Sequence, residues 1–259
     1  MSLSLPEGDG PLRRERLRTA RLYFVCDARP DGDLEALLRA ALTGGADIVQ
    51  LREKELGRAE IERAAGTFRR VADTFSALFI LNDDPELART CDADGVHLGQ
   101  DDVSPEEARR ILGPNAIIGL STHSKEQIAA AGAAPDQADQ GRRERSVLRT
   151  QATEDADMRR SGAASSIDYI SVGPIWETPT KEGRPAVGLD LISHAAANAP
   201  HPFFAIGGID GGNAAEVVRA GAERLCAVRA IRDAADPAAA AAELRQAFAE
   251  APRGVAPGG

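Results

Sequence analysis

Aromatic residues, cysteines and long apolar runs are all scarce in this chain of 259 residues. Only 4% of the residues are aromatic although 43% are hydrophobic, so Ala, Val, Leu and Ile must build the core. No segment approaches the ~20 consecutive apolar residues that a transmembrane helix needs. Residues 1–20 carry several arginines without an apolar stretch, which is unlike a secretory signal and predicts a flexible N-terminal arm.

The three cysteines, Cys26, Cys91 and Cys226, are odd in number and far apart in the chain. Each lies among apolar or small residues, which predicts buried free thiols in a reducing cytoplasm rather than disulfides or a metal site. The formal net charge of −9 argues against nucleic acid or an anionic membrane as a partner. We therefore expect a cytoplasmic protein, and the sequence leaves a homo-oligomer open.

Short apolar runs alternate with amphipathic segments along most of the chain. The expected strands are Leu22–Cys26, Ile48–Leu51, Ala77–Leu81, Gly95–Leu98, Ala116–Leu120, Tyr169–Val172, Phe203–Ile206 and Leu225–Val228. Helical patterns include Asp33–Thr43, Arg58–Phe75, Pro105–Leu112, Gly212–Ala220 and Pro237–Ala249. Buried strands separated by helices are typical of parallel sheets. We expect an α/β protein with one (β/α)8 TIM barrel over residues 21–250 and a flexible tail over 251–259. A doubly wound sheet is the structural alternative.

Residues 132–166 interrupt this alternation. The segment is rich in Asp, Glu and Arg and offers few apolar side chains for burial, which predicts a largely disordered polar insertion before the sixth strand. It would join the fifth helix to that strand, on the face of the barrel away from the active site. The sequence leaves open whether the insertion has no function or docks a partner.

Polar side chains gather directly after the expected strands, where a (β/α)8 barrel carries its reactive groups. In "VQLREK", residues 49–54, the side chains of Gln50, Arg52 and Lys54 alternate and so point the same way. The polar residues at the other strand ends are Asn82, Asp83, His97, Gln100, Asp101, Asp102, Ser121, Thr178, Thr180, Lys181 and Arg229.

These residue types indicate phosphate chemistry. Carboxylates from two strand ends make a Mg²⁺ site when the metal also shares the phosphate oxygens of a substrate. Arg52 and Lys54 would bind the same polyphosphate from the other side. The glycine pair Gly207 and Gly208 lets backbone N–H groups approach a second phosphate in the usual phosphate loop of this fold. The set predicts two phosphorylated small-molecule substrates, one of them bound with Mg²⁺.

Six motifs occur in order at the strand ends: "VQLREK", "LNDD", "ADGVHLGQDD", "GLSTHS", "GPIWETPTKEGRPAVGL" and "AIGGI". Together they resemble the thiamine-phosphate synthase family over roughly residues 20–250, apart from the insertion. The resemblance implies a Mg²⁺-assisted transferase that joins 4-amino-2-methyl-5-hydroxymethylpyrimidine diphosphate to 4-methyl-5-(2-phosphoethyl)thiazole. In that family pyrophosphate leaves first, in a dissociative step, and the thiazole nitrogen captures the pyrimidine methyl cation.

The resemblance also implies a role for each residue. The pyrimidine diphosphate set is Gln50, Arg52, Lys54 and Asn82; the Mg²⁺ ligands are Asp83 and Asp102; the thiazole phosphate set is Thr178, Thr180, Gly208, Val228 and Arg229. Ser121 corresponds to the residue beside the reacting methylene, and Lys181 to a lysine that contacts pyrophosphate. Ser121, Lys181 and Arg52 are therefore the expected catalytic residues. Arg229 departs from the serine of many members, and we expect its side chain to contact the phosphate.

Three other functions stay open. A generic phosphate-binding barrel isomerase would need an acid–base pair that faces a sugar phosphate, and the sequence offers no clear one. Related thiazole tautomerases use a histidine near the position of His123, but they tend to lose the cations and the acidic pair that this chain keeps. A non-catalytic thiamine-phosphate-binding protein would bind the product without turnover. We expect His97 to be a hydrogen-bonded structural residue rather than a ligand.

Overall fold

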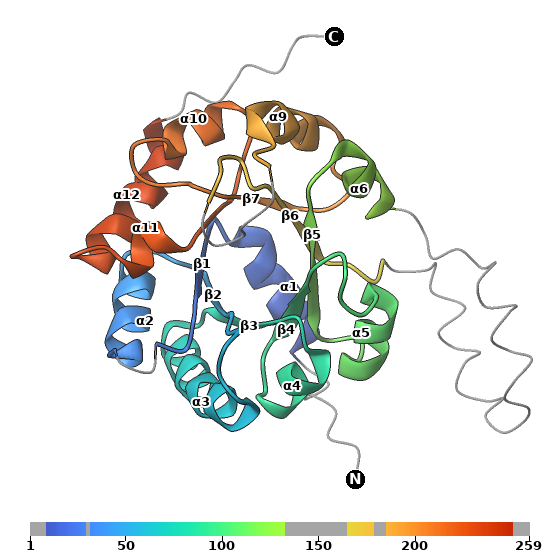
Figure 1. The fold of residues 1–259 in the computed structure, drawn as a ribbon, viewed down its shortest axis with the longest axis vertical. Coiled ribbons are helices and arrows are strands. Elements are labelled where there is room, and N and C mark those ends of the chain that lie inside the picture. The colour runs from blue at the N-terminus through green and yellow to red at the C-terminus, as the bar shows by residue number, and fades with distance from the viewer. Residues whose placement is uncertain (1–8, 30–31, 133–164, 179–184, 251–259) are drawn as a thin grey trace, which may run out of the picture.

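The computed structural model describes residues 9–29, 32–132, 165–178 and 185–250. Eight parallel strands pair in chain order and close into a barrel, with helices around the outside (Figure 1). The strands are β1 Leu22–Cys26, β2 Ile48–Leu51, β3 Leu78–Asn82, β4 Gly95–Leu98, β5 Ile117–Thr122, β6 Tyr169–Val172, β7 Phe203–Ile206 and β8 Leu225–Ala227. The predicted single-domain (β/α)8 barrel is confirmed, and the doubly wound alternative is wrong because β1 pairs with β8.

The outer ring is made of helices, and several of them begin at a residue whose side chain caps the first turn. Its members are α2 Leu34–Thr43, α3 Arg58–Phe75, α4 Pro85–Thr90, α5 Pro105–Leu112, α6 Lys125–Ala130, α9 Gly188–Asn198, α10 Ala214–Arg219, α11 Arg229–Arg232 and α12 Pro237–Glu250. The side chains of Asp33, Asp84 and Ser104 each accept a hydrogen bond from a backbone N–H in the first turn of the helix that follows. None of the described helices is long and apolar enough to cross a membrane.

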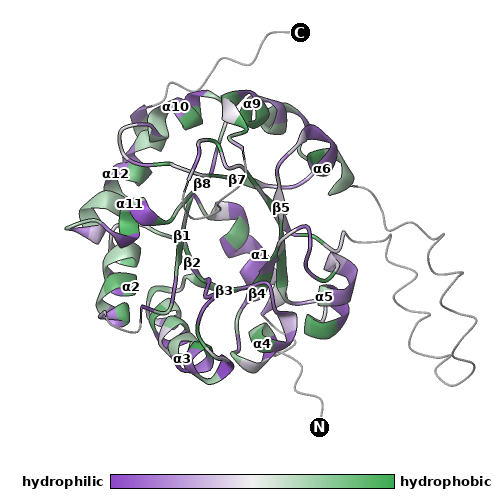
Figure 2. Cartoon of the chain, in the orientation of Figure 1, coloured by the Kyte–Doolittle hydropathy of each residue, from purple (hydrophilic) through white to green (hydrophobic). Residues whose placement is uncertain are grey.

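Apolar side chains form two cores because successive strand residues point to opposite faces. Outward-facing residues such as Phe24 and Phe79 pack with Leu38 and Phe68 of the surrounding helices. Inward-facing residues, including Tyr23 and Ile80, fill the barrel itself. Figure 2 shows the matching pattern, with helices that carry both hydrophobic and hydrophilic residues.

A further helix, α1 (Gly10–Thr19), lies across the N-terminal end of the barrel (Figure 1). Leu17 packs into the inner core, and the buried Arg13 donates from Nε to Oδ1 of Asp94, 2.8 Å away. The expected flexible arm over residues 1–20 is therefore wrong for residues 10–19. The segment contains four arginines, so it was expected not to pack against the barrel. Two of these arginines, however, form hydrogen bonds with aspartates that lie far away in sequence.

The insertion at 132–166, apart from its ends, and the tail at 251–259 lie outside the described residues. The two ends of the insertion meet at the N-terminal end of the strands, where α6 finishes and β6 begins. The ring Nε2 of His201 lies 3.1 Å from both Ala131 O and Ser165 Oγ, so one side chain connects the two ends. This junction is at the opposite end of the barrel from the strand-end residues singled out above.

Candidate active site

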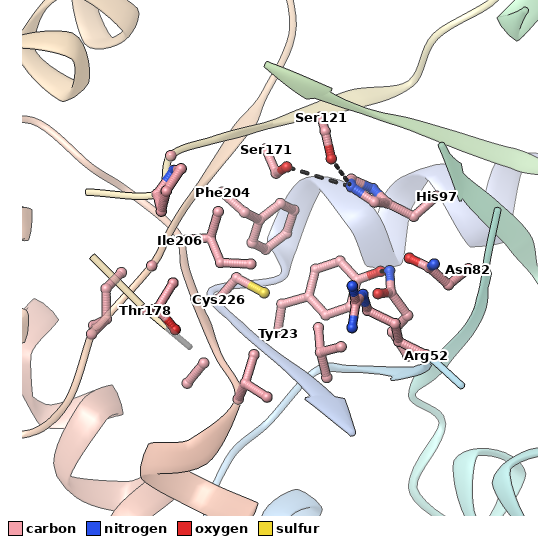
Figure 3. A pocket seen from close by; sticks show the side chains of 18 of the residues that line it. Tyr23, Arg52, Asn82, His97, Ser121, Ser171, Thr178, Phe204, Ile206 and Cys226 are labelled. Atoms are coloured by element: carbon pink, nitrogen blue, oxygen red, sulfur yellow. Dashed lines mark hydrogen bonds between the residues drawn. The ribbon is translucent and has the colours of Figure 1, made fainter. Parts of the chain in front are cut away.

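A cavity of about 730 Å³ lies at the C-terminal ends of the strands. Every residue that the sequence assigned to the site and that the structure describes lines this cavity: Gln50, Arg52, Lys54, Asn82, Asp83, Asp102, Ser121, Thr178, Gly208, Val228 and Arg229. Figure 3 shows Arg52, Asn82 and Thr178 around the same space. Thr180 and Lys181 lie outside the described residues.

Strand β2 and the turn after it provide the cationic wall. Gln50 is buried and points into the barrel. The backbone N–H of Arg52 donates to Cys26 O at 2.9 Å, which continues the β1–β2 pairing one residue beyond the strand. Within the described part of the chain its guanidinium has no carboxylate partner. Lys54, in contrast, forms an ion pair with Asp83.

The loops after β3 and β4 provide the acidic wall. Asp83 has a positive φ of 68°, a left-handed conformation that Asp adopts more readily than most residues, and its N–H donates to His97 O at 2.8 Å. Asp102 accepts at Oδ2 from the N–H of Gly99, 2.6 Å away. Burial and the neighbouring Asp102 carboxylate raise the pKa of Asp83, although Lys54 opposes them.

This raised pKa indicates a place where a bound cation would be favourable, because a nearby cation stabilises both ionised carboxylates. Among the described residues no group of three or more His, Cys, Asp or Glu side chains could hold a metal by itself. Two carboxylates with room for phosphate oxygens nevertheless fit the usual coordination of Mg²⁺, which takes one or two protein carboxylates and completes its shell with water and substrate.

The glycine turn after β7 approaches the loop after β6 closely. Gly207 and Gly208 have φ values of 109° and 70°, and a Cβ on Gly207 would lie 2.4 Å from Pro174 Cα. Only glycine fits this combination of left-handed backbone and contact. The turn therefore brings bare backbone to the cavity beside Val228 and Arg229, as a phosphate-binding loop requires.

The floor of the cavity contains Tyr23 and Ser171, two polar residues that the sequence analysis did not select. A row of hydrogen bonds runs from Gln50 through Tyr23, Tyr169 and His97 to Ser121. Figure 3 shows His97 between the hydroxyls of Ser121 and Ser171. The prediction that His97 is hydrogen-bonded is confirmed, but its partners include a cavity residue. Tyrosines at inward-facing strand positions are the signal that would have revealed the row.

Similarity to known proteins agrees with this geometry. The family model described as "Thiamine monophosphate synthase" matches residues 22–140 and 145–231. The chain is 44% identical over 235 residues to a thiamine-phosphate synthase of Thermobifida fusca, covering 90% of this chain and 94% of that protein. It is 43% identical over 230 residues to one from Thermus thermophilus, covering 87% of this chain and 96% of that protein.

Solved structures also resemble this chain. A thiamine phosphate pyrophosphorylase from Pyrococcus furiosus superimposes with a TM-score of 0.70 at 29% identity, covering 93% of this chain and 98% of that chain. A 3-hexulose-6-phosphate synthase, at 21% identity and a TM-score of 0.52, covers 88% of this chain and 99% of that one and shares the fold alone. The chain belongs to the thiamine monophosphate synthase family.

Proposed function

We propose that this chain condenses 4-amino-2-methyl-5-hydroxymethylpyrimidine diphosphate with 4-methyl-5-(2-phosphoethyl)thiazole, giving thiamine phosphate and pyrophosphate. One observation carries the proposal: the cations Arg52 and Lys54 and the acids Asp83 and Asp102 line one cavity. A diphosphate between these walls would meet a guanidinium on one side and a carboxylate-held cation on the other. Neutralising the leaving pyrophosphate is what a dissociative substitution requires.

Gln50, Arg52, Lys54 and Asn82 are proposed to bind the pyrimidine diphosphate. In this proposal the guanidinium of Arg52 is available for bidentate contact with phosphate oxygens, since it has no carboxylate partner among the described residues. Asp83 and Asp102 would hold Mg²⁺, which would neutralise charge on the diphosphate. Lys54 would then exchange its contact with Asp83 for one with phosphate.

The remaining residues are assigned to the reacting centre and the thiazole. Ser121 would lie beside the methylene and assist departure of pyrophosphate, together with Arg52 and Lys181. Thr178, Thr180, Gly208, Val228 and Arg229 would bind the thiazole phosphate. Gly208, Val228 and Arg229 lie along one side of the cavity, from the glycine turn to the start of α11, which supports a shared phosphate.

A turnover assay tests the proposal. The purified chain is mixed with both substrates in the presence of Mg²⁺ or of EDTA, and thiamine phosphate is read as its fluorescent thiochrome derivative. We expect product with Mg²⁺ and none with EDTA. Folded protein that makes no product under either condition would overturn the proposal.

A second incubation, with the thiazole alone and no metal, separates the tautomerase alternative, which predicts isomerisation under those conditions. Binding of thiamine phosphate without turnover would indicate the non-catalytic alternative. The cytoplasm is the proposed location, because Cys26, Cys91 and Cys226 are all free thiols. The partners are proposed to be these small molecules, without nucleic acid or membrane.

A further inference from the structure

Two tyrosines at the bottom of the cavity, Tyr23 in its lining and Tyr169 behind it, have hydroxyls within hydrogen-bond distance of each other. Tyr23 of β1 and Tyr169 of β6 are almost fully buried, with 2% and 0% of their surface exposed. Their hydroxyl oxygens are 3.0 Å apart. Gln50 Nε2 lies 2.7 Å from the Tyr23 oxygen, and His97 Nδ1 lies 3.0 Å from the Tyr169 oxygen. The row continues from His97 Nε2 to Ser121 Oγ, again over 3.0 Å.

With the Gln50 amide oriented as in the structure, the protons in this row have one fully satisfied arrangement. Gln50 Nε2 can only donate, so the Tyr23 oxygen accepts and its own proton is available for Tyr169. The Tyr169 oxygen then accepts, and its proton is available for His97 Nδ1. If the direction were reversed, the Tyr23 proton would have no acceptor within the row, and a buried donor without a partner destabilises a fold. Burial raises the pKa of both tyrosines, so both hydroxyls keep their protons.

The direction of these hydrogen bonds determines which ring nitrogen of His97 carries the proton. An imidazole that accepts at Nδ1 carries its proton on Nε2 when it is neutral. The ring stacks on Tyr169, with centroids 5.5 Å apart and planes 25° apart, so it is held in place as well as hydrogen-bonded. In that tautomer the Nε2–H faces Ser121 Oγ, with Ser171 Oγ further away at 3.4 Å. Ser121 is therefore an acceptor toward His97, and its own proton is left for another partner.

We propose that Tyr169 is a positioning residue, which keeps the His97 proton on Nε2 so that Ser121 turns its own proton toward the cavity. This inference rests on the proposed function, in which Ser121 assists the departing pyrophosphate. A hydroxyl activated by a basic imidazole would be a nucleophile, as in hydrolases. The direction of this row makes Ser121 a hydrogen-bond donor instead, which suits a reaction that needs negative charge stabilised rather than a nucleophile.

The tautomer of His97 can be measured without any substrate. The full chain is labelled with ¹⁵N, and the ring signals of its four histidines are recorded in long-range ¹H–¹⁵N spectra. A His97→Gln variant identifies the His97 signals by their loss. We expect a protonated Nε2 and an unprotonated Nδ1 in the wild-type chain. In Tyr169→Phe, which keeps the ring but removes the donor, we expect the form protonated at Nδ1 to become populated.

Turnover measures the consequence for Ser121. We expect Tyr169→Phe to lower kcat about tenfold, the scale of one lost hydrogen bond. The KM for the pyrimidine diphosphate should change less than about threefold, because Arg52 and Lys54 are untouched. Tyr23→Phe is the matched control, since it removes the same atom one link further away. Tyr169 still donates to His97 in that variant, so kcat should fall less and the His97 spectrum should stay as in the wild type.

A double variant tests whether Tyr169 acts through Ser121. If it does, Ser121→Ala with Tyr169→Phe should be no slower than Ser121→Ala alone. Additive losses would overturn the proposal, as would a His97 proton on Nδ1 in the wild-type chain or identical His97 spectra in wild type and Tyr169→Phe. The wild-type spectrum decides the tautomer even if Tyr169→Phe does not fold. If no variant and no wild-type sample turns over substrate, the proposed function fails, while the spectra still decide the state of His97.

Discussion

The two ends of the barrel are both rich in charge but use it in opposite ways. At the N-terminal end, aspartates directly precede three alternate strands: Asp47 before β2, Asp94 before β4 and Asp168 before β6. Each accepts a backbone N–H from the neighbouring strand and pairs with at least one arginine. At the C-terminal end, Asp83 and Asp102 lie close together, and the Arg52 guanidinium has no acidic partner within the described part of the chain.

We interpret this difference as one between charge that stabilises the fold and charge that is proposed to bind ligands. The N-terminal aspartates are satisfied within the chain, so they fix strand ends, and Asp94 and Asp168 also attach α1 to the barrel. The C-terminal carboxylates include a pair that raises a pKa, which is an arrangement that a ligand or metal would relieve. Substitutions at the N-terminal end should therefore lower stability and leave activity intact. Substitutions at the C-terminal end should lower activity and leave stability intact.

The largest effect is expected for Asp94→Ala at the N-terminal end. The change leaves the buried guanidinium of Arg13 and the Phe79 N–H without their acceptor. We expect the free energy of unfolding to fall by ~3–5 kcal/mol in urea denaturation, with kcat of the folded fraction unchanged. Asp73→Ala is the control, because Asp73 also pairs with Arg69 but is exposed, and it should cost at most ~1 kcal/mol. Equal losses of stability in Asp94→Ala and Asp73→Ala would contradict a structural role for the buried aspartate.

Arg52→Ala, at the C-terminal end, should weaken ligand binding and leave stability unchanged. We expect the affinity for the pyrimidine diphosphate, measured by calorimetry, to weaken by ~2–4 kcal/mol through loss of a charge-assisted contact. The free energy of unfolding should stay within ~0.5 kcal/mol of the wild type. Arg63→Ala, which removes the same charge from an exposed position on α3, should change neither quantity. Unaltered affinity in Arg52→Ala would refute the assignment of this residue.

Asp102→Ala tests whether the acidic wall holds Mg²⁺. If Asp102 is a ligand, the Mg²⁺ concentration for half-maximal turnover should rise by about tenfold or more, and kcat should fall. Asp101→Ala is the matched control, because Asp101 is adjacent and also lines the cavity. A metal titration of turnover measures both variants. If the Mg²⁺ dependence of Asp102→Ala were that of the wild type, the metal would have to bind elsewhere.

The smallest effect is expected for removal of residues 134–164 and closure with a short linker. His201 connects the two ends of the insertion at the end of the barrel opposite the cavity. Loop-closure entropy depends only weakly on loop length, so the barrel should fold as before. We expect kcat within about threefold of the full chain in the same turnover assay. A folded deletion variant without activity would show that the insertion contributes to the site.

The fold was predictable because parallel strands buried on both faces appear as short apolar runs. The predicted strand bounds agree with the structure to within two residues, and β1, β2, β4, β6 and β7 agree at both ends. Helix α1 was missed because its stability depends on partners that a local pattern cannot show. Arg13 and Arg14 pair with Asp94 and Asp168, which are 81 and 154 residues further along the chain.

The cavity lining was predictable for a related reason. Side chains directly after parallel strands converge whatever their separation in sequence, so Arg52, Asp83 and Asp102 could be grouped from strand ends alone. The hydrogen-bonded row beneath them was not found. Tyr23 and Tyr169 lie within strands, and their hydroxyls meet only because β1 and β6 face each other across the barrel interior. Contact across a closed barrel depends on curvature and register, which periodicity does not contain.

Helix α1 also affects how molecules enter and leave. With Leu17 packed among the inward-facing residues of the barrel, that end is closed to ligands. Both substrates must then arrive, and both products must depart, through the same end as the cavity. A ligand bound deepest enters first and leaves last, so a shallow ligand retained after reaction would block its neighbour. Because the cavity opens at one end, the order in which ligands bind and leave depends on how deep each one lies as well as on its affinity.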